Sequence, residues 1–308
     1  MRTLLTRWGR CALAAYLMAG AASGCADESN APFPAGGSDS WVFGVLPDTQ
    51  TYSDVAPETF EAETAWFRDA AETELDLKMV LHVGDIVEHN SPGEWAVARS
   101  AFDTLQGAVP YVLAVGNHDM GENGSASDRT TLLDEYFPVV DFDLLDPDTL
   151  LAEGRVENAA HFLTPYVGSA EWMVLVLEFA PRQAALRWAE SILSEHPEAR
   201  TILLTHSYLY DDGTRYSAAR ADEQSWDVTE YAVGRDPDAP GAHAEEVYER
   251  LVRPHGQVEL VLCGHVLGEG VAHRTSAQDD GGFVHEILSN YQHTDDLLAG
   301  VVRGDRGG

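Results

Sequence analysis

Gly116-Asn117-His118-Asp119 directly follows an apolar run, Val109 to Val115, whose pattern predicts a buried strand. Because a glycine there permits a tight turn, the next three side chains are expected at the strand's carboxyl end, where open α/β sheets bind ligands. Asn117 offers a carbonyl oxygen to a metal ion, and His118 can donate or accept a proton near neutral pH. Asp119 is placed to orient the His118 ring. Taken alone, the tetrapeptide is equally consistent with an ordinary polar turn.

Four other apolar runs end in polar residues of the same chemical kind. These residues are Asp48 with Gln50, Asp85, His206 and His265. Aspartate oxygens, amide oxygens and imidazole nitrogens together suit divalent first-row metal ions. One carboxylate can bridge two such ions about 3.5–4 Å apart, as in two-metal hydrolytic sites. Each aspartate could instead form a turn, and each histidine could be a hydrogen-bonded core residue. Five coincidences at strand ends favour a metal site.

Strands and helices alternate in the first part of the chain, and paired strands follow later. Strands are expected at Trp41–Leu46, Met79–Val83, Val109–Val115, Ala159–Leu163, Trp172–Phe179, Thr201–Leu204, Val258–Cys263 and Phe283–Leu288. Helices are expected from Pro57 to about Leu75, from the capping box Ser91-Pro92-Gly93-Glu94 onward, and at Asp128–Tyr136, Pro181–His196 and His243–Arg253. This order predicts a layered α/β fold with a mixed sheet core. Since no linker divides it, one domain is predicted from about 41 to 305.

The chain is strongly acidic, with 51 Asp and Glu residues against 19 Lys and Arg and a formal charge of −32. Lys78 is its only lysine. Such a surface repels nucleic acid, which argues against long polynucleotide substrates. An anionic substrate would need a local positive charge, and a bound metal ion is the obvious supplier.

Residues 1–24 have the features of a secretory signal: a basic start and an apolar stretch too short to span a bilayer. The sequence Ala22-Ser23-Gly24-Cys25 resembles the bacterial lipobox and predicts lipid attachment to Cys25; an ordinary signal peptide is the alternative. Residues 25–40 have the composition of a flexible tether. The predicted location is therefore the periplasmic or cell-surface side of a bacterial membrane, through a lipid anchor. Cys263 is then the one remaining thiol, so no internal disulfide is expected.

The blocks at the strand ends keep an order that resembles the calcineurin-like metallophosphoesterase family across residues 41–292. These blocks are Asp48-Thr49-Gln50, Gly84-Asp85, Gly116-Asn117-His118-Asp119, Thr205-His206 and Gly264-His265. The resemblance implies a four-layer α/β/β/α sandwich with a dinuclear metal centre between loops at the sheet ends.

The resemblance also implies a role for each matching residue. The implied ligands of the first ion are Asp85, Asn117, His206 and His265. Asp85 matches the carboxylate that bridges both ions, and Asp48 matches a ligand of the second ion. His118 matches the histidine that stabilises the phosphoryl oxygens or protonates the leaving group, with Asp119 supporting it.

Two residues depart from the family pattern, and both belong to the second ion's site. Gln50 stands where the family usually has the histidine of Asp-x-His, and Leu267 stands where it has the last histidine of Gly-His-x-His. Gln50 can still offer an oxygen, whereas Leu267 cannot coordinate a metal. Oxygen-only ligands favour harder ions such as Mn²⁺, Mg²⁺ or Ca²⁺, bound weakly. Glu269 and His273 are candidate substitute ligands, with an ordinary loop residue as the alternative for each.

The first functional hypothesis is an exported, lipid-anchored enzyme that hydrolyses a small phosphomonoester or phosphodiester with metal-activated water. Its cofactor is expected to be one or two divalent ions among Mn, Fe, Zn, Mg and Ca. Arg215, in the loop after His206, is a candidate phosphate contact, with a surface arginine as the alternative. The second hypothesis is a non-catalytic surface binding protein on the same scaffold with a degraded second metal site, which Gln50 and Leu267 favour.

Overall fold

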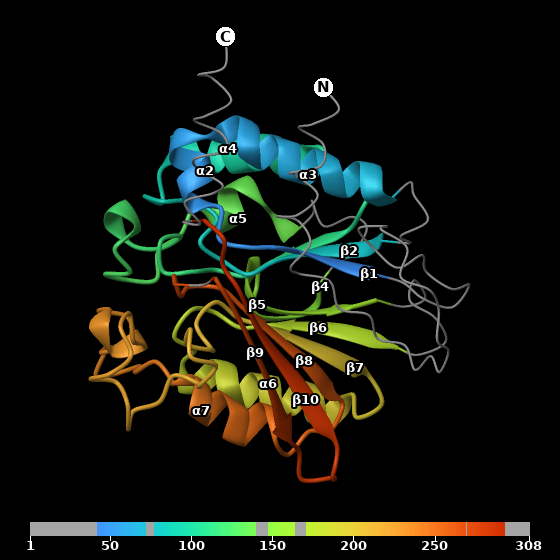
Figure 1. The fold of residues 1–308 in the computed structure, drawn as a ribbon, viewed down its shortest axis with the longest axis vertical. Helices are drawn as coiled ribbons and strands as arrows, with labels where there is room; N and C mark the ends of the chain where they lie inside the picture. Colours follow the sequence, from blue (N-terminus) through green and yellow to red (C-terminus); the bar gives the residue numbers. More distant parts are fainter. Residues whose placement is uncertain (1–41, 72–76, 140–146, 164–170, 269, 293–308) are drawn as a thin grey trace.

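Two β-sheets lie face to face between two groups of helices in the computed structural model of the chain (Figure 1). The structure describes residues 42–71, 77–139, 147–163, 171–268 and 270–292. The strands are β1 (Val42–Leu46), β2 (Leu77–His82), β3 (Tyr111–Leu113), β4 (Pro147–Ala152), β5 (Arg155–Phe162), β6 (Trp172–Val176), β7 (Arg200–Leu204), β8 (Val258–Cys263), β9 (Val271–Ala277) and β10 (Phe283–Ser289). The helices are α2 (Gln50–Val55), α3 (Pro57–Ala71), α4 (Pro92–Asp103), α5 (Leu133–Tyr136), α6 (Gln183–Glu195) and α7 (Ala244–Val247), with short helical turns η2 (Glu122–Gly124), η4 (Val228–Glu230) and η5 (Tyr248–Val252).

The first sheet contains three parallel strands in the order β1-β2-β3. Every residue of β1 and β3 is buried, as expected for parallel strands covered on both faces. Helices α3 and α4 cover the outer face of this sheet (Figure 1), where the Phe60 and Phe102 rings meet edge-on with centroids 5.7 Å apart. Pro57 and Pro92 occupy the first positions of these helices, where a missing N–H removes no intrahelical bond.

The second sheet contains seven strands in the order β4-β5-β6-β7-β8-β10-β9. Its central strands β6, β7, β8 and β10 run parallel, whereas β4, β5 and β9 pair antiparallel with their neighbours. Helices α6 and α7 cover the outer face (Figure 1), and Leu186, Leu193 and Val247 join the apolar core there. The predicted mixed sheet is therefore present.

A third apolar cluster fills the space between the two sheets. Alternation along β1 directs Phe43 and Val45 into this cluster, while Val42 and Leu46 pack with the helices. From the second sheet, Trp172 contributes its ring, 5.7 Å from that of Phe43. Each fully buried side chain of this size stabilises the fold by about 1.5–3 kcal/mol. The four layers, helix on sheet on sheet on helix, confirm the predicted α/β/β/α sandwich.

Three elements, α2, β4 and β9, are absent from the sequence prediction, and one predicted helix is shorter than expected. Strand β9 lies at the edge of its sheet and alternates exposed with half-buried residues, so no apolar run marks it. The predicted helix Asp128–Tyr136 is wrong over its first part, because Asp128 Oδ1 accepts a hydrogen bond from Thr130 N at 2.8 Å and forms a turn. Only α5 is helical in that range.

Only one of the two hydrogen bonds of the predicted capping box forms at the start of α4. Ser91 Oγ accepts from the backbone N–H of Glu94 at 3.4 Å, as expected for an N-cap. The Glu94 carboxylate, however, turns to His89, accepting from its backbone N–H at 2.8 Å and contacting its Nδ1 at 2.7 Å. The imidazole competes for the carboxylate because a charge-assisted contact is stronger than one to an amide.

Several predictions fall on parts of the chain outside the described residues. These are the signal 1–24, Cys25, the tether 25–40 and the domain limits 41 and 305, which stay predictions. Cys263 is buried and free, in agreement with the expected lack of a disulfide at this residue. Among the described residues, none of the helices combines the length and apolar content needed to cross a membrane.

Candidate metal centre

The strand ends of both sheets meet at one place. Asp48, Asp85 and Asn117 follow β1, β2 and β3 of the first sheet, whereas His206 and His265 follow β7 and β8 of the second. Main-chain bonds tie these ends together: Thr49 N donates to Asp85 O at 3.0 Å, and Gly264 N donates to His206 O at 2.9 Å. The structure thus brings together the residues that the sequence placed at strand ends.

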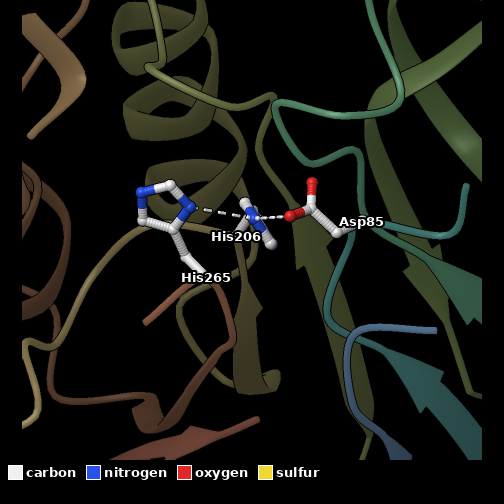
Figure 2. A group of neighbouring side chains, drawn as sticks. All are labelled: Asp85, His206 and His265. Atoms are coloured by element: carbon white, nitrogen blue, oxygen red, sulfur yellow. Dashed lines mark hydrogen bonds and ion pairs between the residues drawn. The ribbon is translucent and has the colours of Figure 1, made fainter. Parts of the chain in front are cut away.

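Asp85, His206 and His265 form the centre of this group, as Figure 2 shows. His206 Nε2 lies 3.1 Å from Asp85 Oδ2 and 3.2 Å from His265 Nδ1. One ligand atom from each residue lies within 4.8 Å of the other two. A carboxylate oxygen and two imidazole nitrogens therefore converge on one point.

Hydrogen bonds on the outer sides of the two rings fix their orientation. His206 Nδ1 lies 2.9 Å from the carbonyl oxygen of Val83, and His265 Nε2 lies 2.8 Å from the carbonyl oxygen of Trp226. Since a carbonyl only accepts, each of these nitrogens carries a proton, and the other nitrogen of each ring faces inward, where it can bind a metal ion that takes the place of a proton. Outer bonds of this kind are typical of histidines that coordinate metals.

Two further oxygens near this centre have no hydrogen-bond partner among the described residues. They are Asn117 Oδ1 and Gln50 Oε1, both buried. A buried carbonyl oxygen without a partner is destabilising by about 1–3 kcal/mol unless a cation or water satisfies it. The unsatisfied oxygens and the inward ring nitrogens together fit a divalent metal ion.

Asp48 lies beside this group, although it is not one of the three converging residues. Its Oδ2 accepts from the backbone N–H of His265 at 3.0 Å and from Asn290 Nδ2 at 2.8 Å. Burial raises the pKa of Asp48 well above its usual range, even though His206 acts in the opposite direction. Asn290 follows β10, and no local sequence pattern marked it as a neighbour of the site.

The backbone is strained at two of the proposed ligands. Asp85 has φ of 51° and His265 has φ of 79°, a region that residues with a Cβ rarely adopt. The glycines beside the site are required for a different reason: a Cβ atom at Gly116 would overlap Asp85 Oδ1, and one at Gly264 would overlap Asp48 Oδ1. The strained backbone places Asp85 and His265, and the absence of side chains at Gly116 and Gly264 leaves room for the Asp85 and Asp48 carboxylates.

The charges at the centre are strongly coupled. Although burial opposes ionisation of Asp85, the charges of His206 and His118 lower its pKa. Burial likewise opposes the charged form of His206, but Asp85 and Asp48 raise its pKa to about 9. Burial and the nearby His206 charge lower the pKa of His265 to about 3. The negative potential that holds a proton on His206 is equally suited to a metal cation.

His118 lies at the wall of the cavity, but Asp119 does not orient it as predicted. His118 Nδ1 lies 2.9 Å from the carbonyl oxygen of Glu88, and its backbone N–H donates to Asp85 Oδ1 at 2.9 Å. The Asp119 carboxylate instead accepts from three backbone N–H groups, those of Ile86, Val87 and Gly116, at 2.8–2.9 Å. Asp119 therefore ties the loop after β2 to the loop after β3, because three amide donors outcompete one ring.

A cavity of about 440 Å³ opens above the centre. Among its lining residues are Gln50, Asp85, Asn117, His118, His265 and Leu267. The apolar Leu267 side chain thus lies in the cavity wall, as the sequence departure suggested. Trp226, Tyr231 and Glu88 also line the cavity, and sequence reasoning missed them because no motif marks these loops.

The remaining candidate residues lie elsewhere. Arg215 is buried and bonds Glu286 through Nη2 at 2.6 Å, so the phosphate contact and the surface arginine are both wrong interpretations. His273 is exposed on β9 and contacts His285, 3.2 Å away, outside the cavity wall. Glu269 lies outside the described residues.

The chain is similar to several known proteins. The uncharacterized protein YvnB of Bacillus subtilis is 25% identical over 262 residues. These residues cover 82% of this chain and 18% of YvnB, so the chain spans less than a fifth of that relative.

Two solved structures also align with this chain. Purple acid phosphatase PPD1 from yellow lupin (Lupinus luteus) seeds has a TM-score of 0.47 at 16% identity, over 81% of this chain and 46% of that one. GAP50, described as the anchor in the inner membrane complex of Plasmodium, has a TM-score of 0.40 at 12% identity, over 79% and 70%. Residues 42–269 match the calcineurin-like phosphoesterase family, and the chain belongs to that family.

Proposed function

We propose that this protein is an exported, lipid-anchored, metal-dependent phosphoesterase that hydrolyses a small phosphomonoester or phosphodiester. The observation that carries the proposal is the convergence of Asp85 Oδ2, His206 Nε2 and His265 Nδ1, with the unpartnered oxygens of Asn117 and Gln50 nearby. Membership of the calcineurin-like phosphoesterase family supports the reaction class.

The residues divide between two ion sites. Asp85, Asn117, His206 and His265 would hold the first ion. Asp85, Asp48 and Gln50 would hold a second, weaker one. Divalent ions bound there supply positive charge for the phosphoryl oxygens and acidify water for attack on phosphorus.

His118 is the proton donor in this proposal. Its Nδ1 is engaged by the Glu88 carbonyl, which leaves Nε2 as the atom that can serve the substrate. Although burial opposes it, the Asp85 carboxylate and the Glu88 carbonyl raise the pKa of His118, which favours the protonated ring. A proton held at Nε2 can stabilise a phosphoryl oxygen or pass to the leaving alcohol.

The direct test is hydrolysis by the full purified chain of a panel of phosphomonoesters and phosphodiesters, with Mn, Fe, Zn, Mg and Ca supplied in turn. The control is a His206→Ala, His265→Ala double variant, which removes both inward nitrogens. Turnover that depends on metal and disappears in the double variant is expected. Tight metal binding without hydrolysis of any ester would instead favour the non-catalytic binding protein, which Leu267 in the cavity wall also favours.

The membrane anchor is tested separately. Cells that express the chain and receive labelled palmitate should incorporate the label into the protein, and Cys25→Ser should abolish incorporation. Cys263→Ser is the matched control, since this buried thiol is not expected to be acylated. Equal labelling of the Cys25→Ser protein would contradict the anchor.

A further inference from the structure

The cavity has more hydrogen-bond acceptors and negative charges than the metal centre uses. Asp54 and Glu88 line it in addition to Asp85, whereas none of its described lining residues is Lys or Arg. Asp54 lies on α2 and is exposed. A substrate that carries only negative charge would bring its phosphate to the metal ions but would leave these two carboxylates facing an uncharged or repelled group.

Glu88 lies beside His118 in the cavity wall. Its side-chain Oε1 lies 3.6 Å from His118 Nδ1, and its carbonyl oxygen holds the same ring. Glu88 thus lies one imidazole ring away from Nε2, the His118 atom proposed to protonate the leaving alcohol. Asp54 has His89 as a basic neighbour, but that ring is already engaged by Glu94 at 2.7 Å. Asp54 is exposed and the Glu88 side chain is 29% exposed, so both carboxylates can also meet a cationic substituent in the cavity.

Trp226 supplies an aromatic surface to the same cavity. The residue has φ of 60°, which is rare for a bulky side chain, and 39% of it is exposed. Two contacts hold this strained residue in place. The Trp226 carbonyl oxygen accepts a hydrogen bond from His265 Nε2 at 2.8 Å, and the following residue, Asp227, caps η4 with a reciprocal capping box. Tyr231 adds a second ring to the wall, 6.0 Å from His265 between centroids. A large exposed aromatic held under strain at a cavity mouth indicates a binding role.

We propose that Trp226, Glu88 and Asp54 bind an ammonium group on the leaving alcohol, so that the preferred substrates are phosphoesters of amino alcohols such as choline or ethanolamine. A quaternary or primary ammonium satisfies both features of the wall, because it is attracted to carboxylates by charge and to an indole face by cation–π interaction. The assignment of the ammonium group to the leaving alcohol rests on the proposed phosphoesterase activity, whereas ammonium binding itself does not.

The kinetic test compares choline phosphate with 3,3-dimethylbutyl phosphate, each as the monoester and as the methyl diester. The two alcohols have the same shape, but choline has a positively charged nitrogen where 3,3-dimethylbutanol has a neutral carbon. The kcat/KM of the choline ester is expected to exceed that of its neutral isostere by about tenfold or more. Trp226→Leu and Asp54→Asn should each reduce this ratio, whereas Phe283→Leu, at an exposed aromatic on β10 outside the cavity wall, should leave it unchanged. A purely structural role of Trp226 would lower both rates and keep the ratio.

The binding test does not depend on turnover. Calorimetric titration of the full chain with choline and with 3,3-dimethylbutan-1-ol should show binding of the cation alone, weakened by Trp226→Leu. Choline binding without hydrolysis of any ester would support the ammonium site and contradict the proposed catalysis. Equal binding and equal rates for the charged and neutral compounds would overturn the ammonium site while leaving the phosphoesterase intact. A preference that survives both substitutions would overturn its assignment to these residues.

Discussion

At the scale of single residues, His118 is proposed to serve catalysis without binding a metal ion. It lines the cavity, but its ring is held by Glu88 and is not among the converging ligand atoms. His118→Ala should therefore lower kcat by about 10²–10⁴-fold, the usual contribution of a general acid, while the tight ion stays bound. The measurements are turnover and metal content of the same preparation, with the exposed His273→Ala as control. Loss of the metal, or unchanged turnover, would contradict this role.

Leu267 is a second case in which a single side chain matters, because it is expected to set the affinity of the second ion. It lies in the cavity wall and offers no lone pair. Leu267→His should lower the free Mn²⁺ concentration needed for half-maximal rate, since an imidazole replaces the apolar group. The improvement should be partial because Gln50 still replaces the other histidine. Leu267→Ala is the matched control, which opens the same space without adding a ligand. Overlapping rate curves for the histidine variant and the original chain would show that position 267 does not reach the ion.

At the scale of elements, α3 carries a carboxyl group in an unfavourable place. Burial raises the pKa of Glu63 from 4.5 to about 8, and its Oε2 has no hydrogen-bond partner among the described residues. Because the folded-state pKa is raised, the carboxyl is neutral in both states below pH 4.5. Stability is then lost as the pH rises from 4.5 through about 8, by at most about 1.4 kcal/mol per unit of pKa difference.

Glu63→Gln should therefore leave stability nearly unchanged near pH 4 and increase it near pH 9. Urea unfolding at both values measures the difference, with Glu58→Gln at an exposed position of the same helix as control. An equal gain at both pH values would show that the effect comes from packing and not from ionisation.

The element scale also shows what the sequence could predict. Strands that are mostly apolar, such as β2 and β8, were predictable, and so were the polar residues that follow them. Asp85 and His265 could be placed because each follows closely after a strand, so the end of that strand fixes its position. The partner of Asp119 could not be predicted, because three backbone amides from two loops outcompete the neighbouring ring only in the folded chain. Arg215 was misread for a similar reason, since Glu286 lies far along the sequence on β10.

At the scale of the whole molecule, the metal centre joins the two sheets. Asp85 and Asn117 follow strands of the first sheet, and His206 and His265 follow strands of the second. An ion held by all four should therefore stabilise the packing between the layers, by about 2.7 kcal/mol at a concentration 100 times its Kd. The thermal midpoint should fall after chelation and recover with Mn²⁺.

The His206→Ala, His265→Ala double variant should show no such recovery, whereas His118→Ala should behave like the original chain. Two titration steps are expected, one tight and one weak, because the first site has two imidazoles and the second has none. Two equally tight sites would contradict this division.

The segment between His206 and His243 has a consequence for how the protein can change. It leaves the second sheet after one ligand and returns at α7, carrying Trp226 and Tyr231 into the cavity wall. The capping box of Asp227 holds it from within, and Arg215 ties it to Glu286 on β10. Apart from the Trp226 carbonyl on His265, the bonds that support the ligands come from other parts of the chain. Because the support that Trp226 gives His265 comes from the main chain, the side chains at 226 and 231 can be exchanged, so that evolution or an engineer can alter what the cavity accepts while the ring of His265 stays in place.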